Sequence, residues 1–350
     1  MSIGCLVKRA IHILFFVFLT VTVANGAQSS GAVSLNSPSV GSTVSGAAPT
    51  PITEPPGAYV LPSNLCGVPD ASAGLQAALD AAKGRALWIP DGCTVNTSRF
   101  SLISSNTTIA CGQGVTIHSM TPMTCNDPPP ALESRMESNI TVEGCTFTGD
   151  YTPSMAAQLS GMCGSYGVFG GAVPAAFYAG SNITFTDNAV TNEMGGVGLL
   201  FDQTSNVTIS NNYFAYSYEN SLQLSNCKNC NVTGNTSLDA NWNMEDAGAL
   251  PAGYDTGTWS NNTFACDSTG VGFYTQNAGW RTFLGGTCPW TVGIGCSEAS
   301  GICTPGEYSG VTVQNNTITG PGASLVTSSV WGGSSVINNS FTNGGVLTPR

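Results

Sequence analysis

The stretch SNVTISNNYF, residues 205–214, recurs in similar form about 24 residues away on either side, and this repeat limits what the chain can fold into. Each copy alternates apolar and polar residues, contains β-branched residues and ends in a polar pair, usually two asparagines. That alternation predicts short β-strands bounded by turns and excludes helical repeats. A period of about 20–50 residues indicates a solenoid, in which each coil packs only on its neighbours.

Seven copies of the repeat align on the second residue of the polar pair. The spacings along this column are 43, 24, 23, 27, 54 and 23 residues, so the long gaps correspond to one or two periods plus an inserted loop. Because stacked asparagine side chains can hydrogen-bond from coil to coil, the column predicts a ladder at a turn. The column consists of Cys145, Asn188, Asn212, Asn235, Asn262, Asn316 and Asn339.

Two residues beyond the column, six of the seven copies have an apolar residue, which predicts an inward-facing stack inside the solenoid. Ser237 interrupts this stack, so we expect its coil to be slipped or differently turned. The apolar positions are Phe147, Val190, Phe214, Phe264, Ile318 and Phe341.

The N-terminus has the three parts of a secretory signal peptide. Lys8 and Arg9 precede the apolar run AIHILFFVFLTVTVA, and Ala24, Asn25 and Gly26 supply the small residues of a cleavage site. The run is shorter than the roughly 20 apolar residues that span a bilayer. We therefore expect residues 1–26 to be removed on export, leaving a secreted protein without a membrane anchor.

The next segment, residues 27–57, is rich in Ser, Pro and Gly and almost uncharged, which indicates a flexible linker. The remaining residues, 58–350, are long enough for one large domain or two. Because the repeats run through this whole region, we expect one solenoid domain.

A stack of parallel strands leaves unpaired strand edges at both ends, and these need a cover. The segment SAGLQAALDAAKGRALWIPDG, residues 72–92, provides one. Its apolar residues recur at helical spacing up to Gly84, which predicts a short helix followed by a first strand, ALWIP. The apolar positions of this helix are Leu75, Ala78, Leu79 and Ala82.

This helix, the strand that ends in Pro90, Asp91 and Gly92, and the following NTTIACGQGVTIHS resemble the opening of the pectate-lyase superfamily. The resemblance covers roughly residues 58–350 and implies an all-β fold, a single right-handed parallel β-helix with a short N-terminal capping helix. It also implies a glycan cleft along one face, near the turn and strand that follow the asparagine-bearing turn. Superfamily members include lyases, polygalacturonases, epimerases and surface proteins, so the fold alone does not settle the function.

Export is also consistent with the cysteine content. Loss of Cys5 would leave 12 of the 13 cysteines, an even number that suits up to six disulfides. Cys227 and Cys230 form a C-x-x-C pair, a spacing also found in redox motifs and zinc sites. No helical pattern follows this pair, and His118 is the only histidine after the signal peptide, which favours structural disulfides.

The chain has 20 acidic and 9 basic residues, a net charge of −11. This charge disfavours nucleic acid and anionic membranes as partners. It tolerates neutral glycans, cations such as calcium, and polyanions bridged by a metal. With 41% hydrophobic residues the chain can still build a core.

Eleven acidic residues lie within residues 143–267, shortly after successive positions of the asparagine column. Coils about 4.8 Å apart bring carboxylates on neighbouring coils to the separations that glycosidic hydrolysis needs. Crowding would also raise the pKa of one carboxyl, as an acid catalyst requires. A solvated acidic face or a calcium site is the alternative. We predict an acid–base centre of Glu219 with Glu245 or Asp246, supported by Glu193.

The segment YSYENSLQLSNCKN, residues 216–229, resembles the strand of polygalacturonase-like hydrolases that carries two acids, with Glu219 and Asn220 near those positions. The Asn-Thr-Asp, Gly-His-Gly and Arg-x-Lys motifs of these enzymes are missing, so only Glu219 carries over. Lyases of the superfamily commonly use Arg or Lys as the base, for which Arg135, Lys228 and Arg281 are candidates. Arg281 follows Trp280, although such a pair also forms by simple packing.

Aromatic side chains could provide faces on which sugars stack, and Tyr218, Trp242, Trp280 and Trp290 are the candidates. Trp259 instead alternates inward with its repeat and is predicted to lie in the core. We therefore expect a secreted protein that processes an extracellular polysaccharide by hydrolysis or β-elimination, with no cofactor beyond a possible calcium ion. A non-catalytic adhesion or glycan-binding protein built on the same stack is the alternative.

Ten asparagines head N-x-[ST] sequons, which can accept glycans in exported proteins. Several lie within the repeat itself, where Asn and Thr are structural choices, and this favours a structural role. The ten are Asn96, Asn106, Asn139, Asn182, Asn206, Asn231, Asn235, Asn261, Asn315 and Asn338.

Overall fold

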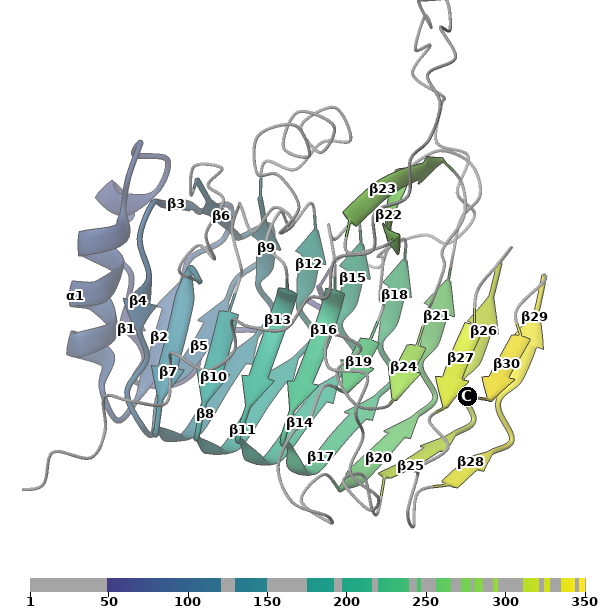
Figure 1. Cartoon of the computed structure of the whole chain (residues 1–350). Coiled ribbons are helices and arrows are strands. Elements are labelled where there is room, and N and C mark those ends of the chain that lie inside the picture. The colour runs from purple at the N-terminus through teal and green to yellow at the C-terminus, as the bar shows by residue number, and fades with distance from the viewer. Residues whose placement is uncertain are drawn as a thin grey trace, which may run out of the picture. The chain divides into compact units, whose positions relative to one another are not determined.

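The chain winds repeatedly through three parallel β-sheets, called A, B and C here, and each coil contributes one strand to each sheet (Figure 1). All described residues belong to one unit, Val40–Arg350. The computed structural model describes residues 49–120, 130–149, 175–191, 197–215, 220–238, 244–246, 256–265, 272–277, 280–285, 292–294, 311–320, 324–327, 335–343 and 346–349.

Sheet A has ten described strands and follows the VTIS-type half of each repeat, as the alternating pattern predicts. Its strands, in spatial order, are β1 (Tyr59–Val60), β2 (Ala86–Ile89), β5 (Thr108–Cys111), β8 (Ser138–Glu143), β11 (Ser181–Thr186), β14 (Ser205–Ser210), β17 (Lys228–Thr233), β20 (Gly257–Ser260), β25 (Val311–Gln314) and β28 (Ser335–Ile337).

Sheet B holds nine described strands, short ones that begin directly after the polar pair of the repeat in most coils. These are β3 (Thr94–Thr97), β6 (Thr116–Ser119), β9 (Thr146–Thr148), β12 (Ala189–Thr191), β15 (Tyr213–Ala215), β18 (Thr236–Leu238), β21 (Thr263–Ala265), β26 (Thr317–Thr319) and β29 (Ser340–Thr342).

Sheet C closes each coil and also has nine described strands. Its strands are β4 (Ser101–Leu102), β7 (Leu132–Arg135), β10 (Ala175–Tyr178), β13 (Val197–Asp202), β16 (Asn220–Ser225), β19 (Met244–Asp246), β24 (Val292–Ile294), β27 (Ser324–Thr327) and β30 (Val346–Pro349). Outside the three sheets are the 3-10 helix η1 (Ser63–Leu65), the helix α1 (Ser72–Ala82) and an antiparallel hairpin of β22 (Gly272–Asn277) and β23 (Trp280–Gly285).

The predicted asparagine column forms a continuous buried ladder at the turn from sheet A to sheet B. Each amide Oδ1 accepts the backbone N–H and the Nδ2–H of the preceding member; Asn212 accepts these from Asn188 at 2.9 and 3.2 Å. The Asn212 Nδ2 donates to the carbonyl of Phe185 and to Asn235 Oδ1, both at 2.9 Å. The same bonds continue to Asn339. The buried polar groups of this turn are therefore satisfied from coil to coil.

The inward stack is confirmed, with Phe147, Phe214 and Ile318 at most 1% exposed. Trp259, at 1% exposed, lies in the core as its alternation predicts. The expectation that Ser237 marks a slipped coil is wrong: Ser237 pairs in register with Phe214 and with Phe264. The ladder, rather than the residue in the stack, sets the register, because the bonds of Asn235 to both neighbours are intact.

A second asparagine ladder lies on the outside of sheet A, where the sequence analysis identified only sequons. Its asparagines are exposed and have positive φ, as Asn206 does at 53°, and each Nδ2 donates to the preceding Oδ1 at 2.9–3.1 Å. Asparagine tolerates this conformation better than most residues, which gives these sequons a structural reason. Asn235 heads a sequon in the buried ladder, at 3% exposed. The outer ladder consists of Asn106, Asn139, Asn182, Asn206 and Asn229.

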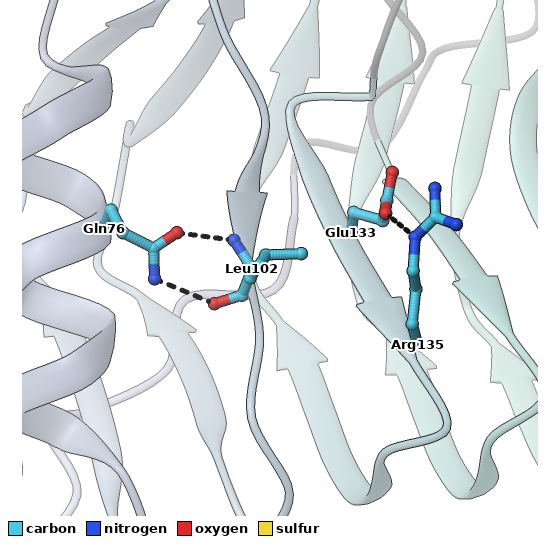
Figure 2. A network of polar contacts seen from close by, with 4 residues as sticks. All are labelled: Gln76, Leu102, Glu133 and Arg135. Atoms are coloured by element: carbon cyan, nitrogen blue, oxygen red, sulfur yellow. Dashed lines mark hydrogen bonds and ion pairs between the residues drawn. The ribbon is translucent and has the colours of Figure 1, made fainter. Parts of the chain in front are cut away.

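The predicted capping helix is α1, which buries Leu75, Leu79 and Ala82 against the first coils. Gln76 covers the edge of sheet C in a specific way, because its side-chain amide replaces a missing strand (Figure 2). Its Oε1 accepts the N–H of Leu102 at 2.7 Å, and its Nε2 donates to the Leu102 carbonyl at 3.3 Å. An edge that would otherwise be open to pairing is therefore closed.

The cap begins at Asp70, whose carboxylate accepts hydrogen bonds from the N–H and hydroxyl of Ser72 and from the Ser98 hydroxyl. These bonds, the one from the Ser72 side chain foremost, lower the pKa of Asp70 to about 2. The carboxylate therefore stays charged over the whole range in which an ordinary aspartate titrates, and it anchors the first turn of α1.

Three disulfides join described residues: Cys66–Cys93, Cys111–Cys145 and Cys227–Cys230. The C-x-x-C pair is thus a disulfide within the pair. Cys145 occupies the column position where the first asparagine would stand, and its N–H still donates to Asn188 Oδ1 at 2.9 Å. Its disulfide to the coil before it takes over the connection that the ladder makes elsewhere.

The predicted signal peptide and the linker up to residue 48 lie outside the described residues. Residues 49–57 contain neither helix nor strand. Ile52 nevertheless packs close to Gly144, since a side chain at Gly144 would meet its Cδ1 at 3.1 Å and the Cys111 carbonyl oxygen at 2.8 Å. Gly144 also has a φ of 72°, so two independent reasons require glycine there.

Replacing one member of the buried ladder should destabilise the protein far more than replacing one of the exposed ladder. Asn212→Ala leaves the Asn188 N–H and amide without an acceptor, and we expect a loss of at least about 3 kcal/mol in the free energy of unfolding. Asn206→Gly keeps the positive φ and exposes its partners to water, so we expect a loss below about 1 kcal/mol. Urea denaturation followed by circular dichroism measures both, and equal losses would contradict the role assigned to the buried ladder.

Disulfides that close loops of different length should differ in their contribution. Replacing Cys111 and Cys145 by alanine opens a loop of 34 residues, whereas Cys227 and Cys230 are 3 apart. The entropy of the unfolded chain then predicts losses of about 4 and about 1.5 kcal/mol, respectively. All four cysteines are at most 2% exposed, so lost packing is similar in both double variants. A larger drop in melting temperature for the second variant would refute this order.

Candidate functional site

The connections between sheets differ sharply in how much length they tolerate. From β8 onward, every turn from sheet A to sheet B has two residues, the length that the buried ladder requires. Connections from sheet B to sheet C range from three residues, between β29 and β30, to 26, between β9 and β10. Insertions on a rigid stack are where binding and catalytic residues usually lie. The edge between sheets B and C is therefore the place to look for a site.

The chain order places all of the predicted site residues in these connections or in the sheet C strand that follows. Trp280 and Arg281 lie on β23, within the connection from β21 to β24, and Glu245 and Asp246 lie on β19. Five candidates fall outside the described residues, each in a connection from sheet B to sheet C: Glu193, Tyr218, Glu219, Trp242 and Trp290.

Strand register separates the two acids of β19. Glu245 pairs with Gln223, which is partly exposed, whereas Asp246 pairs with Leu224, which is 1% exposed. Successive residues of a strand alternate between its two faces. Glu245 therefore occupies the outward column of sheet C, and Asp246 occupies the column that runs through the core.

The hairpin places its two candidates at its turn. Trp280 pairs with Asn277 and Arg281 with Gln276. The hairpin is an insertion between β21 and β24, so these residues belong to an excursion rather than to the stack of coils (Figure 1).

Among the described residues, sheet C carries a charged cluster on β7 that sequence analysis identified only in part. Glu133 has a side chain only 5% exposed, and it forms an ion pair with Arg135, whose side chain is 58% exposed (Figure 2). The Arg135 guanidinium also lies over the ring of Tyr178 on β10, 5.1 Å from its centroid. The hydrogen bond and charge of Glu133 raise the pKa of Arg135. A buried carboxylate thus holds an exposed cation beside an aromatic face.

Asp202, on β13, is a further carboxylate of sheet C that sequence analysis did not select. It occupies the same register column as Arg135 and Tyr178. Burial raises the pKa of Asp202, and a hydrogen bond with Asn226 partly opposes this. A raised carboxyl pKa is what a general acid needs. The alternation in VGLLFD could have placed Asp202 on the outward face, but sequence gave no sign of its desolvation.

The remaining lyase candidate, Lys228, lies apart from this cluster. It begins β17 on sheet A and is exposed, as its position beside a turn predicts. Glu143, at the end of β8 on the same sheet, also has a raised pKa, through burial and the charge of nearby Asp187. Sheet A therefore offers a carboxylate with similar electrostatics outside the candidate site.

The described part of the chain shows no cluster of three or more His, Cys, Asp or Glu residues that could hold a metal ion. We therefore assign no described residue to calcium. In the described residues there is likewise no helix with the length and apolar content of a membrane span.

Comparison with known proteins yields matches in structure alone. Neither models of protein families nor curated protein sequences give a match. The A-module of the mannuronan C-5 epimerase AlgE6 from Azotobacter vinelandii matches with a TM-score of 0.51 and 13% identity, over 83% of this chain and 79% of that one. A family 28 exopolygalacturonase from Yersinia enterocolitica has a TM-score of 0.49 and 11% identity, over 83% and 66%. The Streptococcus pneumoniae surface protein and adhesin PfbA has 0.34 and 12%, over 84% and 100%.

The chain has the right-handed parallel β-helix fold of the pectate-lyase superfamily. This confirms the fold class that the repeat and the N-terminal resemblance predict, including the short capping helix. At identities this low the similarity shows the fold alone, and the chemistry of the β-helix has to be argued from its own residues.

The raised pKa values of Asp202 and Glu143 predict how their amide variants respond to pH. Because each group binds its proton more tightly when folded, its ionised form costs stability at pH values above its folded pKa. Asp202→Asn and Glu143→Gln should therefore raise the melting temperature at neutral pH. The gain should shrink as pH falls, and vanish below the pKa that each carboxyl has in the unfolded chain. Melting curves across pH measure this, and a gain that grows toward acid pH would reverse the assignment.

Proposed function

We propose that this β-helix is a secreted protein that processes an extracellular polysaccharide on the outward face of sheet C. One observation carries the proposal: register and chain order collect the candidate acids, cations and aromatics on sheet C and on the connections that lead into it. Export is supported by the signal-peptide pattern and by three disulfides, which persist in oxidising compartments.

Hydrolysis of a glycosidic bond needs one carboxyl group that protonates the leaving oxygen and a second that activates water or attacks. Asp202 suits the first role, because burial favours its protonated form. Glu245 suits the second, since its outward column faces solvent. Asp246, in the inward column, is the weaker of the two β19 candidates. Glu219, which directly precedes β16, remains a candidate partner for either acid, and Glu193 a supporting one.

The spacing of these strands restricts the mechanism. β13 and β19 are separated by β16, and Asp202 is offset by two residues from the position that aligns with Glu245, so their Cα atoms are about 12 Å apart. Inverting hydrolysis uses carboxyl groups about 6.5–9.5 Å apart. It would require the two side chains to lean toward each other over Gln223. A retaining mechanism, at about 5 Å, would instead require Glu219 to supply one of the acids.

Arg135 and Tyr178 fit the role of substrate-binding residues in this arrangement. An exposed guanidinium over an aromatic ring offers a carboxylate partner and a stacking face for a sugar within one contact. A polysaccharide that carries carboxylates would therefore be held despite the negative charge of the protein. Trp242, Trp280 and Trp290 are the further candidate sugar platforms, with Tyr218.

β-Elimination is the alternative reaction on the same face. It would need a base at the α-proton of a uronic acid, for which Arg281 on the hairpin is the candidate. Calcium, which bridges carboxylates of substrate and protein in such reactions, is tested as an added component in the assay below.

The proposal predicts that the protein cleaves at least one plant, algal or bacterial polysaccharide, and that sheet C carries the activity. Asp202→Asn and Glu245→Gln should each lower kcat by about 10²–10⁴-fold, the usual contribution of an acid or base group. Reducing ends report hydrolysis, and ultraviolet absorbance of an unsaturated product reports β-elimination. Both are measured with and without calcium.

Glu143→Gln is the matched control, because it removes a carboxyl whose pKa is also raised but which lies on sheet A. It should keep full activity while showing the same gain in stability as Asp202→Asn. If all three variants cleave as well as the wild type, the acids of sheet C are not catalytic. Binding of a polysaccharide without release of either product would instead establish a non-catalytic glycan-binding protein.

A further inference from the structure

The two ends of the stack are finished in different ways. At the N-terminal end, α1 packs on the first strands and Gln76 hydrogen-bonds the backbone of β4 (Figure 2). At the C-terminal end, β28, β29 and β30 are the last strands of sheets A, B and C, and no strand in the described part of the chain pairs with their outer edges (Figure 1). Unpaired parallel strands of this kind are templates for pairing with further β-structure.

The core reaches the surface at this end. Val336 and Phe341 continue inward columns in which Val313 and Ile318 are at most 1% exposed, yet both are only partly buried. Ile337 is 44% exposed, and it follows Gln314 in a column of sheet A that is otherwise polar from Thr186 onward. Apolar side chains at the edge strand, in place of the charges that usually protect such an edge, favour burial by a partner.

The buried ladder also stops here with one donor left over. Asn339 Oδ1 accepts from the backbone and the amide of Asn316, both at 2.9 Å, and its own Nδ2 donates to the Val313 carbonyl at 2.9 Å. Every earlier asparagine of the ladder donates its backbone N–H to the next amide, but among the described residues none accepts that of Asn339. Another layer of structure would satisfy it.

We infer that the C-terminal edge formed by β28, β29 and β30 is an interaction surface for a second copy of this chain, joined end to end about a two-fold axis. The partner has to present open β-strand edges, which a second copy does with the same three strands. Head-to-tail pairing is blocked, because the N-terminal edge is already covered by α1 and by Gln76. A two-fold axis makes the contacting strands antiparallel, a pairing at least as stable as the parallel one, and closes the assembly at two copies.

Sedimentation equilibrium of the full secreted chain, from low to high micromolar concentration, tests this surface. The wild type should reach twice the mass of one chain. Ile337→Lys places a charge on the edge and should leave the mass of a single chain. Gln314→Lys is the matched control, since it places the same charge in the same column one strand further in, and it should still dimerise.

Circular dichroism and melting curves establish that each variant is folded. If Ile337→Lys does not fold, Ser340→Lys on β29 replaces it, with Thr317→Lys on the paired position of β26 as control. A wild type that stays monomeric at every concentration overturns the proposal, as does a polymer of increasing size or an Ile337→Lys variant that dimerises like Gln314→Lys. None of these outcomes depends on glycan cleavage, so the test is independent of the proposed function.

Discussion

One hydrogen bond, repeated from coil to coil between buried asparagine side chains, determines most of this structure. The turn from sheet A to sheet B lies against the core, and its polar groups have no access to water. Asn212 serves as an example: its amide accepts two hydrogen bonds from one neighbour and donates to a carbonyl and to the next amide. An isolated amide in that place would be costly to bury, but a continuous ladder satisfies each member.

The ladder explains why the core tolerates irregular residues and the surface tolerates insertions. Because it fixes the turn at two residues, the strands on either side stay in register even where Ser237 stands in a column of Phe and Ile. At the first position Cys145 replaces the asparagine, and a disulfide to Cys111 makes the connection covalent. The edge between sheets B and C is free of this constraint, and it carries connections of up to 26 residues.

The same division decides where chemistry can be placed. A constant turn and a constant register give sheet C outward columns in which residues from distant parts of the sequence line up. Arg135, Tyr178 and Asp202 come from three different coils and share one such column. Glu133 is buried beneath its exposed partner, Arg135. The stack thus provides a rigid face, and the variable connections beside it supply the remaining candidate residues.

The sequence by itself determined the fold class, the asparagine ladder, the inward column, the burial of Trp259 and the helix α1, since each follows from local periodicity. It also named Glu245 and Asp246 together without distinguishing them, and it passed over Glu133, Tyr178 and Asp202. Only the tertiary structure decided those points. Which face a strand residue occupies, what lies on the next coil and how far a carboxyl is removed from water all depend on register between segments more than 20 residues apart. That register is set by pairing across coils, and no single repeat contains it.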